Sequence, residues 1–271
     1  MKRVITSTGG LIGRPNRRDY TLLKDCLPRI RADGVEFMLY DTWYPEMDRL
    51  TDTLLSIPVK YTGLHVEKSI GEYITEGDYD EAKRLFQINC DFARKLGCEH
   101  MVLHLWNGLP SDSHMENNIA YYATLKKMAE DTGIPLSVEN VLCNCHEPIQ
   151  HMFALLERYP DIIFTFDTKM AQFHRQMDRM MSPECATLWP HIRHLHINDY
   201  NGGYLDFSQI RTLHIGDGEI DFDRFFAFLK QVDYDGDLVV EAVTWDENGV
   251  IHPEKMNITL DKIRRYIGKQ Q

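Results

Sequence analysis

Short apolar segments alternate with longer amphipathic segments along the whole chain, and this alternation limits the folds that the chain can adopt. The apolar segments are rich in Val, Ile, Leu and Phe, which is typical of strands buried on both faces of a parallel sheet. The predicted strands are residues 4–8, 35–39, 59–66, 100–106, 135–140, 162–167, 192–198 and 238–242. The predicted helices are residues 20–32, 46–55, 79–96, 113–131, 147–158, a Met-rich segment from residue 171, 222–232 and 253–267.

Eight strand–helix units in 271 residues average about 34 residues each, which is the spacing expected of a (β/α)8 barrel. No low-complexity linker or internal repeat divides them. The sequence therefore predicts an α/β protein with one (β/α)8 TIM-barrel domain over residues 1–271. A doubly wound open sheet is the alternative, but the glycines Gly9, Gly10 and Gly13 after the first strand do not match Gly-x-Gly-x-x-Gly.

Charge and cysteine content narrow the classes of partner. The net charge of −11 disfavours a nucleic-acid partner, although Arg14, Arg17 and Arg18 form a local basic cluster. The chain has no apolar stretch of membrane-spanning length and no apolar signal segment at Met1. Its six cysteines are scattered, which is typical of reduced thiols and predicts a cytoplasmic protein. Self-association into a homo-oligomer is left open.

Four polar residues stand at or near the C-terminal ends of the predicted strands in the second half of the chain. They are Glu139, Asp167, His196 and Glu241. In a barrel, functional residues gather where the strands end, so these side chains are expected to meet at one point. Such a set suits one divalent ion, such as Mn, Zn, Co, Mg or Fe(II). His194 shares a strand face with His196 and is the alternative ligand, but His196 lies nearer the strand end.

Further candidates stand close to these positions. His65 and His104 end two other predicted strands and are expected either to hold a second metal or to contact the bound substrate. Glu36 stands in the second predicted strand. Cys143 and Cys145 form a Cys-x-Cys pair that could bind metal, although reduced structural thiols are the simpler interpretation.

Four more residues are candidate substrate contacts. His214 lies in the loop after the seventh predicted strand. Asp199 could orient a ligand, contact substrate or cap a turn. Trp106 could stack on a sugar face or pack in the core. Lys169 could neutralise an oxyanion or contact phosphate, or it could be a solvated lysine.

Several motifs together resemble the xylose isomerase-like TIM-barrel superfamily, which includes sugar isomerases and epimerases, inosose dehydratase-like enzymes and endonuclease IV. The matching motifs are Ser-Val-Glu139-Asn, Phe-Asp167-Thr, His-Leu-His196-Ile-Asn-Asp199, His214-Ile-Gly-Asp-Gly-Glu-Ile-Asp and Gly-Asp-Leu-Val-Val-Glu241, and they lie between about residues 60 and 245. The resemblance implies that Glu139, Asp167, His196 and Glu241 hold one divalent metal. It also implies that Glu139 and Glu241 double as catalytic acid and base.

The chain departs from two members of that superfamily at specific positions. Met170 and Thr212 stand where endonuclease IV has a His and an Asp of its three-metal site. In the ketohexose 3-epimerases, a His stands at the position of Met170 and an Arg stands at the position of Gly202. We therefore expect no repair-nuclease activity and do not carry over the ketohexose specificity.

These features predict a metal-dependent isomerase or epimerase of a sugar or sugar phosphate. A metal that binds a 2-hydroxy ketone polarises its carbonyl and stabilises the enediolate that forms when a base removes the neighbouring proton. Glu139 and Glu241 could then exchange that proton on opposite faces. A lyase of the inosose dehydratase type is the alternative, and a nuclease is less favoured. We expect one metal, with His65 and His104 contacting substrate; a second metal is the alternative.

Overall fold

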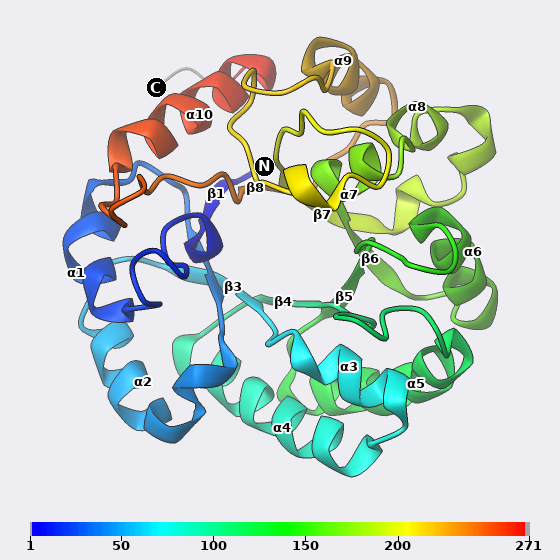
Figure 1. Ribbon diagram of the computed structural model, residues 1–271, viewed down its shortest axis with the longest axis horizontal. Coiled ribbons are helices and arrows are strands. Elements are labelled where there is room, and N and C mark those ends of the chain that lie inside the picture. Colours follow the sequence, from blue (N-terminus) through cyan, green and yellow to red (C-terminus); the bar gives the residue numbers. More distant parts are fainter. Residues whose placement is uncertain (1, 269–271) are drawn as a thin grey trace.

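The strands close into an eight-stranded parallel barrel in the order β1 to β8, with β8 paired to β1 (Figure 1). This computed structural model describes residues 2–268. The strands are β1 Val4–Ser7, β2 Val35–Met38, β3 Tyr61–His65, β4 His100–Leu103, β5 Leu136–Glu139, β6 Ile163–Asp167, β7 Ile192–Ile197 and β8 Asp237–Val240. The predicted (β/α)8 barrel is therefore confirmed.

The helices form a ring around the barrel (Figure 1). The α-helices are α1 Leu23–Cys26, α2 Met47–Leu55, α3 Ser69–Glu76, α4 Tyr79–Leu96, α5 Met115–Thr132, α6 Pro148–Arg158, α7 Thr168–Phe173, α8 Met177–Met180, α9 Phe222–Gln231 and α10 Pro253–Tyr266. Short 3-10 helices are η1 Thr8–Gly10, η2 Tyr20–Leu22, η3 Leu27–Arg29, η4 Asp41–Glu46, η5 Pro183–Cys185, η6 Trp189–His191 and η7 Phe207–Gln209.

The observed helices differ from the predicted ones in two places. The segment 20–32 is divided into η2, α1 and η3, because Pro28 has no backbone N–H for an α-helical bond and stands in the first turn of η3. The helix α3 was not predicted. It is separated from α4 by Gly77, whose φ of 82° ends α3 in the left-handed conformation that glycine adopts without strain.

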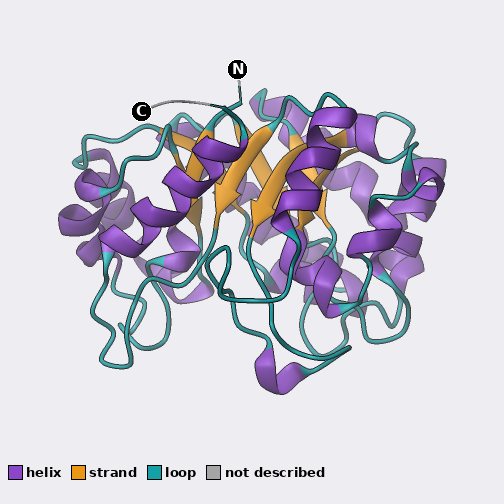
Figure 2. Cartoon of the chain, turned by 90° about the horizontal axis from the view of Figure 1, so that it is seen from above, coloured by secondary structure: helices purple, strands orange, loops and turns teal. Residues whose placement is uncertain are grey.

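Some strand ends also differ from the prediction. β4 ends at Leu103, so His104 and Trp106 lie in the following loop. β8 ends at Val240, one residue before Glu241. Glu139 and Asp167 are the last residues of β5 and β6, as expected. The candidate ligands therefore all lie at the same end of the barrel, where the long loops gather in Figure 2.

The barrel interior is polar below the end that carries the candidate ligands. His194 Nε2 on β7 lies 2.8 Å from Glu36 Oε2 on β2, and the His194 ring stacks on His100 at 4.6 Å. His100 Nε2 in turn contacts Ser137 Oγ at 2.7 Å, and Ser137 Oγ contacts Thr165 Oγ1 at 2.6 Å. All five side chains are buried. A continuous polar network thus replaces the branched apolar layers common in such barrels.

The outer faces of the strands carry the apolar core against the helices. Its largest side chains include Phe37, Phe92, Phe166 and Phe225, all at most 2% exposed. α4 shows how the sequence builds this layer, since its buried residues recur at helical spacing and Asp78 caps its first turn by accepting from Glu81 N. Among the described helices, none is long and apolar enough to span a membrane.

Candidate metal centre

The four predicted ligands converge on one ring nitrogen. His196 Nδ1 lies 3.3 Å from Glu139 Oε1, 3.8 Å from Glu241 Oε2 and 3.9 Å from Asp167 Oδ2. Ligand atoms each about 2.1 Å from one ion are separated by roughly 3–3.5 Å, so these spacings fit around an ion with little adjustment. All four side chains are buried, with Glu241 the most exposed at 8%.

The protein itself provides no hydrogen-bond partner for this nitrogen. His196 Nδ1 is fully buried and has no partner among the described residues. A buried polar atom without a partner is costly, and three carboxylates around it make a cation the natural partner. The donor set of one imidazole and three carboxylates therefore fits a divalent metal, and these four residues would hold it.

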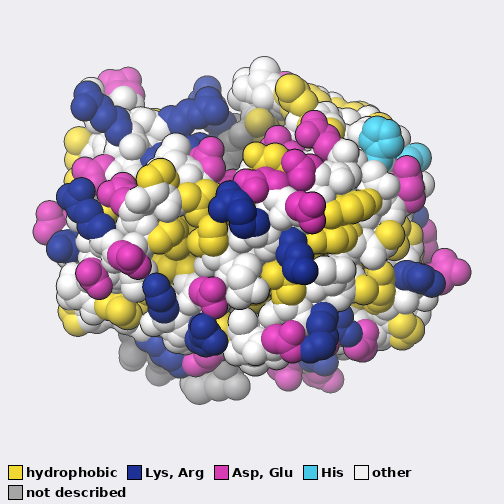
Figure 3. All heavy atoms as spheres, turned by 90° about the horizontal axis from the view of Figure 1, so that it is seen from below, with side chains coloured by type: hydrophobic (Ala, Val, Ile, Leu, Met, Phe, Trp, Pro, Cys, Tyr) yellow, Lys and Arg dark blue, Asp and Glu magenta, His cyan; other side chains and the backbone are white. Residues whose placement is uncertain are grey.

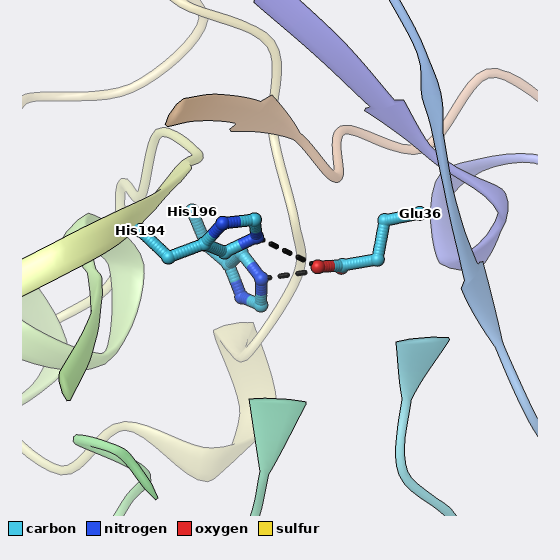
Figure 4. A group of neighbouring side chains, drawn as sticks. All are labelled: Glu36, His194 and His196. Atoms are coloured by element: carbon cyan, nitrogen blue, oxygen red, sulfur yellow. Dashed lines mark hydrogen bonds and ion pairs between the residues drawn. The ribbon is translucent and has the colours of Figure 1, made fainter. Parts of the chain in front are cut away.

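Glu36 lies on the opposite side of the His196 ring. Its Oε1 is 3.2 Å from His196 Nε2, while its Oε2 is 2.8 Å from His194 Nε2. Figure 4 shows both imidazoles pointing from β7 toward this carboxylate on β2. A carboxylate on the far nitrogen of a metal-binding histidine fixes the ring and its tautomer. Of the two histidines, His196 is therefore the candidate ligand, and His194 lies beside Glu36 farther from the three carboxylates.

Charge coupling within the cluster shifts three pKa values. Burial disfavours the ionised forms, but the imidazoles overcome this effect and hold the pKa values of Glu36 and Glu139 well below their usual range. Burial likewise disfavours protonated His196, yet Glu241, Glu139 and Glu36 raise its pKa well above 6.5. The metal-free centre therefore carries a proton on His196 that a metal would displace.

Asp167 behaves differently from the glutamates. Burial, reinforced by the charges of Glu139 and Glu241, raises the pKa of Asp167 to about 6 although Lys169 opposes the shift. Its Oδ1 accepts from Met170 N at the start of α7, at 2.8 Å. Asp167 is thus held in place by the helix that it caps.

Three polar residues without a predicted role hold the ligands in position. Asn198 donates to Asp167 Oδ2 at 2.9 Å and accepts from the backbone N–H of Glu241 at 3.1 Å. Asn140 bonds the backbone of Asp167 on both sides, and Ser7 Oγ donates to Glu241 Oε1 at 3.2 Å. Asn140 and Asn198 stand next to or near predicted ligands in the sequence, and this proximity could have identified them as supporting residues. Ser7 gave no such signal, because β1 meets β8 only when the barrel closes.

His65 and His104 approach the other oxygen of Glu139. Their Nε2 atoms lie 3.3 Å and 3.0 Å from Glu139 Oε2. His65 Nδ1 contacts the carbonyl oxygen of Val66 at 3.0 Å, and a carbonyl only accepts, so Nδ1 carries the hydrogen. His65 Nε2 has no hydrogen-bond partner among the described residues and faces Glu139.

His104 differs, because both of its ring nitrogens contact acceptors. Its Nδ1 contacts Asn107 Oδ1 at 3.2 Å, and Asn107 Nδ2 donates to Glu72 Oε1, which fixes the amide orientation. Burial lowers the pKa of His104 to about 4, so its ring is neutral at pH 7. His65 Nε2 has no hydrogen-bond partner among the described residues, whereas His104 Nε2 is hydrogen-bonded to the ionised Glu139 carboxylate. This arrangement fits a second cation or a proton donor from a bound molecule.

Asp199 and His214 are both engaged within the protein. The Asp199 carboxylate accepts from four backbone N–H groups, those of Tyr200, Gly216, Gly218 and Ile220, at 2.9–3.1 Å. His214 Nδ1 contacts Thr259 Oγ1 at 2.7 Å and its Nε2 contacts the Val243 carbonyl at 3.0 Å. The backbone of the His-Ile-Gly-Asp-Gly motif is therefore organised around the Asp199 carboxylate. This agrees with the alternative that Asp199 caps a turn. His214 lines the pocket but has no free ring nitrogen.

Trp106 and the Cys-x-Cys pair lie away from the pocket. Trp106 is fully buried, donates to the Leu142 carbonyl and packs edge-on against His151. This is the core-packing alternative and does not support stacking on a substrate. Cys143 is buried whereas Cys145 is exposed, and the nearby Asp112 is occupied by three backbone N–H groups and His151. The pair therefore has no shared metal geometry.

A pocket of about 780 Å³ opens beside the centre, and Glu241 lies in its wall. Lys169, buried and donating to Thr212 Oγ1 at 3.3 Å, lines it together with Tyr40 and Trp245. A volume of this size accommodates a small organic substrate. On the side of the molecule seen in Figure 3, basic and acidic side chains are interspersed and form no continuous basic surface.

Comparison with known proteins relates this geometry to a family. Residues 29–265 match the family described as xylose isomerase-like TIM barrel. An inosose dehydratase from Erwinia tasmaniensis is 24% identical over 255 residues, which cover 87% of this chain and 78% of the relative.

Solved structures with similar folds include sugar epimerases. The D-allulose 3-epimerase from Methylomonas sp., in complex with D-allulose, has a TM-score of 0.71 and 18% identity, covering 98% of this chain and 97% of that one. The IolI protein with a bound zinc atom has a TM-score of 0.68 and 13% identity, covering 98% of both chains. These likenesses describe the fold, whereas the family match extends over most of the sequence. The chain therefore belongs to the xylose isomerase-like TIM barrel family.

Proposed function

We propose that this protein is a divalent-metal-dependent sugar isomerase or epimerase that moves a proton on the carbon next to a carbonyl. The observation that carries the proposal is the convergence of Glu139, Asp167 and Glu241 on His196 Nδ1 beside a pocket of about 780 Å³. A bound divalent ion would polarise the substrate carbonyl and stabilise the negative charge that develops when the neighbouring proton leaves.

Glu241 is the residue best placed to move the substrate proton from the pocket side. It lines the pocket. Ser7 Oγ donates a hydrogen bond to its carboxylate, and its backbone N–H donates to Asn198 Oδ1, so both the side chain and the backbone are held in position. Glu139 is its counterpart on β5, on a different part of the rim. Two carboxylates on different sides of a sugar can remove a proton from one face and return it to the other, which inverts the carbon.

His104 and His65 supply hydrogen-bonding or ligand atoms next to Glu139. A substrate hydroxyl that reaches Glu139 Oε2 also meets His65 Nε2, to which it can donate. Lys169 carries a positive charge in the same pocket and can balance the negative charge of the reacting sugar.

A dehydratase of the inosose type is the second candidate. The relative from Erwinia tasmaniensis favours it, and its reaction class needs the same metal and base. The difference is that the carbanion expels a neighbouring hydroxyl as water instead of regaining a proton. A polyol ketone as substrate would therefore give an unsaturated product rather than a stereoisomer.

The proposal is tested by incubating the manganese-loaded protein with a panel of ketoses and inososes in deuterated water. A two-base isomerase places one deuterium on the carbon next to the carbonyl of the product, as mass spectrometry or NMR detects. The Glu241→Gln variant keeps the shape of the side chain but removes its basicity, and its rate should fall by at least a hundredfold. Isomer formation without solvent deuterium contradicts proton transfer, and loss of water from an inosose identifies the dehydratase.

A further inference from the structure

The pocket beside Glu241 is rich in basic side chains, although the chain as a whole carries a net charge of −11. Its basic lining residues are Lys68, Lys169, Arg211, Lys255 and Lys262. Among the described residues that line it, the acidic ones are Glu241 and Asp217. The pocket therefore differs in charge from most of the molecule.

These basic side chains also lack acidic partners. Many lysines and arginines elsewhere are paired, for example Lys126 with Asp161 and Arg179 with Glu147. None of the five basic residues of the pocket forms an ion pair with any residue between positions 2 and 268. Cations that repel one another in a concave site are retained at a cost, and a ligand of opposite charge offsets it.

The basic residues divide into two groups by position. Lys169 lies near the metal centre, where its charge acts on Asp167, and it donates to Thr212 Oγ1. Lys255 and Lys262 stand on α10, and their charges act on His214. Lys262 also donates to the Ile215 carbonyl at 2.6 Å, which aims its Nζ at the loop after β7.

The carboxylates of the metal centre balance only part of the positive charge that lines the pocket. Glu139, Asp167 and Glu241 carry three negative charges, and a divalent ion leaves one of them unbalanced. Lys169, the nearest lysine to Asp167, offsets that remaining charge. At the end of the pocket formed by α10 and the loop after β7, the three cations Lys255, Lys262 and Arg211 face a single acidic lining residue, Asp217, and form no ion pair with it.

We propose that this end of the pocket binds an anionic group of the substrate, a phosphate ester or a carboxylate, through Lys255, Lys262 and Arg211. This inference rests on the proposed isomerase function, which places the carbonyl end of the sugar at the metal centre. The substrate is then a sugar whose far end carries the charge. Cationic side chains of this kind form charge-assisted hydrogen bonds with phosphate and carboxylate oxygens.

Binding measurements on matched pairs of ligands test the assignment. Isothermal titration calorimetry of the manganese-loaded protein compares D-fructose 6-phosphate with D-fructose, and D-fructuronate, whose carboxylate is at the end of the sugar far from the carbonyl, with D-fructose. The anionic ligands should bind on the order of 10- to 100-fold more tightly, because each charge-assisted bond strengthens binding and the advantage falls with added salt. The anionic ligand whose affinity exceeds that of D-fructose by the larger factor identifies the preferred anion as phosphate or carboxylate.

Two variants locate the effect. The Lys255 ammonium group is exposed and forms no ion pair with the described residues, so Lys255→Gln should leave the fold intact and weaken binding of the preferred anionic ligand by about threefold to tenfold, with D-fructose unaffected. Lys24→Gln, at an exposed position of α1 away from the pocket, is the matched control and should change neither. Equal affinity for charged and neutral sugars, or equal effects of both variants, overturns the proposal.

The result is separable from the proposed reaction. Anion preference is measured as binding, and the Glu241→Gln variant should keep it while losing turnover. If deuterium exchange occurs on neutral ketoses that bind as tightly as their phosphates, this inference fails and the proposed function stands. If the anionic ligands are preferred but no ketose is exchanged, the proposed function fails and the anion site stands.

Discussion

Glu36 Oε1 on β2 lies 3.2 Å from His196 Nε2 on β7, across the interior of the barrel. The same carboxylate contacts His194 Nε2 at 2.8 Å through its other oxygen. Because Glu36 occupies the far nitrogen of His196, the near nitrogen faces Glu139, Asp167 and Glu241. The interior of the barrel thus orients the central ligand of the candidate metal centre.

Replacing Glu36 by Gln should weaken metal binding without removing a ligand. The amide keeps the size of the side chain but loses the charge that orients His196, and loss of such a supporting carboxylate typically costs 10- to 100-fold in metal affinity. Competition with a fluorescent chelator measures the affinity. Glu46→Gln, which alters a carboxylate bonded to Tyr20 Oη, is the control and should keep the wild-type value. Unchanged affinity in Glu36→Gln would show that His196 needs no such support.

The number of ions per chain distinguishes the two states of the His65–His104 cluster. His65 Nε2, which has no hydrogen-bond partner among the described residues, lies with His104 Nε2 beside Glu139 Oε2, and this favours a second, weaker ion over the single-metal state that the sequence suggested. With excess zinc, we expect two ions per chain in the wild type and one in His104→Ala, measured by plasma emission spectrometry after gel filtration. His114→Ala, at an exposed position beside α5, is the control. One ion in all three proteins would favour substrate contacts instead.

Metal binding should weaken as pH falls. Metal binding requires ionised Asp167, whose pKa burial raises to about 6, and an unprotonated His196 Nδ1, whose pKa the surrounding carboxylates raise above 6.5. Protons therefore compete with the metal, and affinity should fall at least tenfold between pH 7.5 and 5.5.

In the metal-free protein, Asp167 and His196 should contribute stability with the opposite dependence on pH. Both folded-state pKa values lie above those of the unfolded chain, so these protonated groups favour folding and that contribution is lost as pH rises through the folded values. The buried histidines His100, His104 and His174, whose pKa values burial lowers, oppose this effect equally in both forms of the protein. The rise in melting temperature that metal produces over chelator-treated protein should therefore be larger at pH 7.5 than at pH 5.5. Parallel curves for the two forms would count against the coupled centre.

Asp199 should be needed for the fold of the loop after β7 rather than for metal. Asp199→Ala leaves four backbone N–H groups without their acceptor, and we expect a loss of about 3–4 kcal/mol in the free energy of unfolding. Urea denaturation measures this loss. Asp217→Ala, exposed in the same loop, should cost less than about 0.5 kcal/mol. A stable Asp199→Ala protein with reduced metal content would place Asp199 in the centre instead.

We predict that the protein does not cleave DNA at abasic sites. Met170 and Thr212 replace two ligands of the three-metal repair site, and neither side chain is a carboxylate or imidazole. A duplex with one abasic site, incubated with stoichiometric protein and zinc, should remain intact on a denaturing gel while endonuclease IV cleaves it. Cleavage at that site would contradict the prediction; weak binding at low salt would not, given Arg14, Arg17 and Arg18.

The sequence by itself determined the barrel and the positions of the metal ligands. Buried parallel strands have continuous apolar sequences, and their C-terminal ends share one face, so Glu139, Asp167 and His196 could be placed together from local pattern alone. The helix prediction was wrong where a single residue ends a helix. Pro28 interrupts the segment 20–32, and Gly77 separates α3, which was not predicted, from α4.

Contacts between distant strands and loops were decided only by the tertiary structure. Glu36 meets His196 across the barrel interior, and β1 brings Ser7 to Glu241 only on closure. The burial of Trp106 depends on the loops that cover it. Lys255 joins the pocket because α10 packs beside the loop after β7. These contacts join residues far apart in the chain, and sequence periodicity describes only neighbours along one strand or helix.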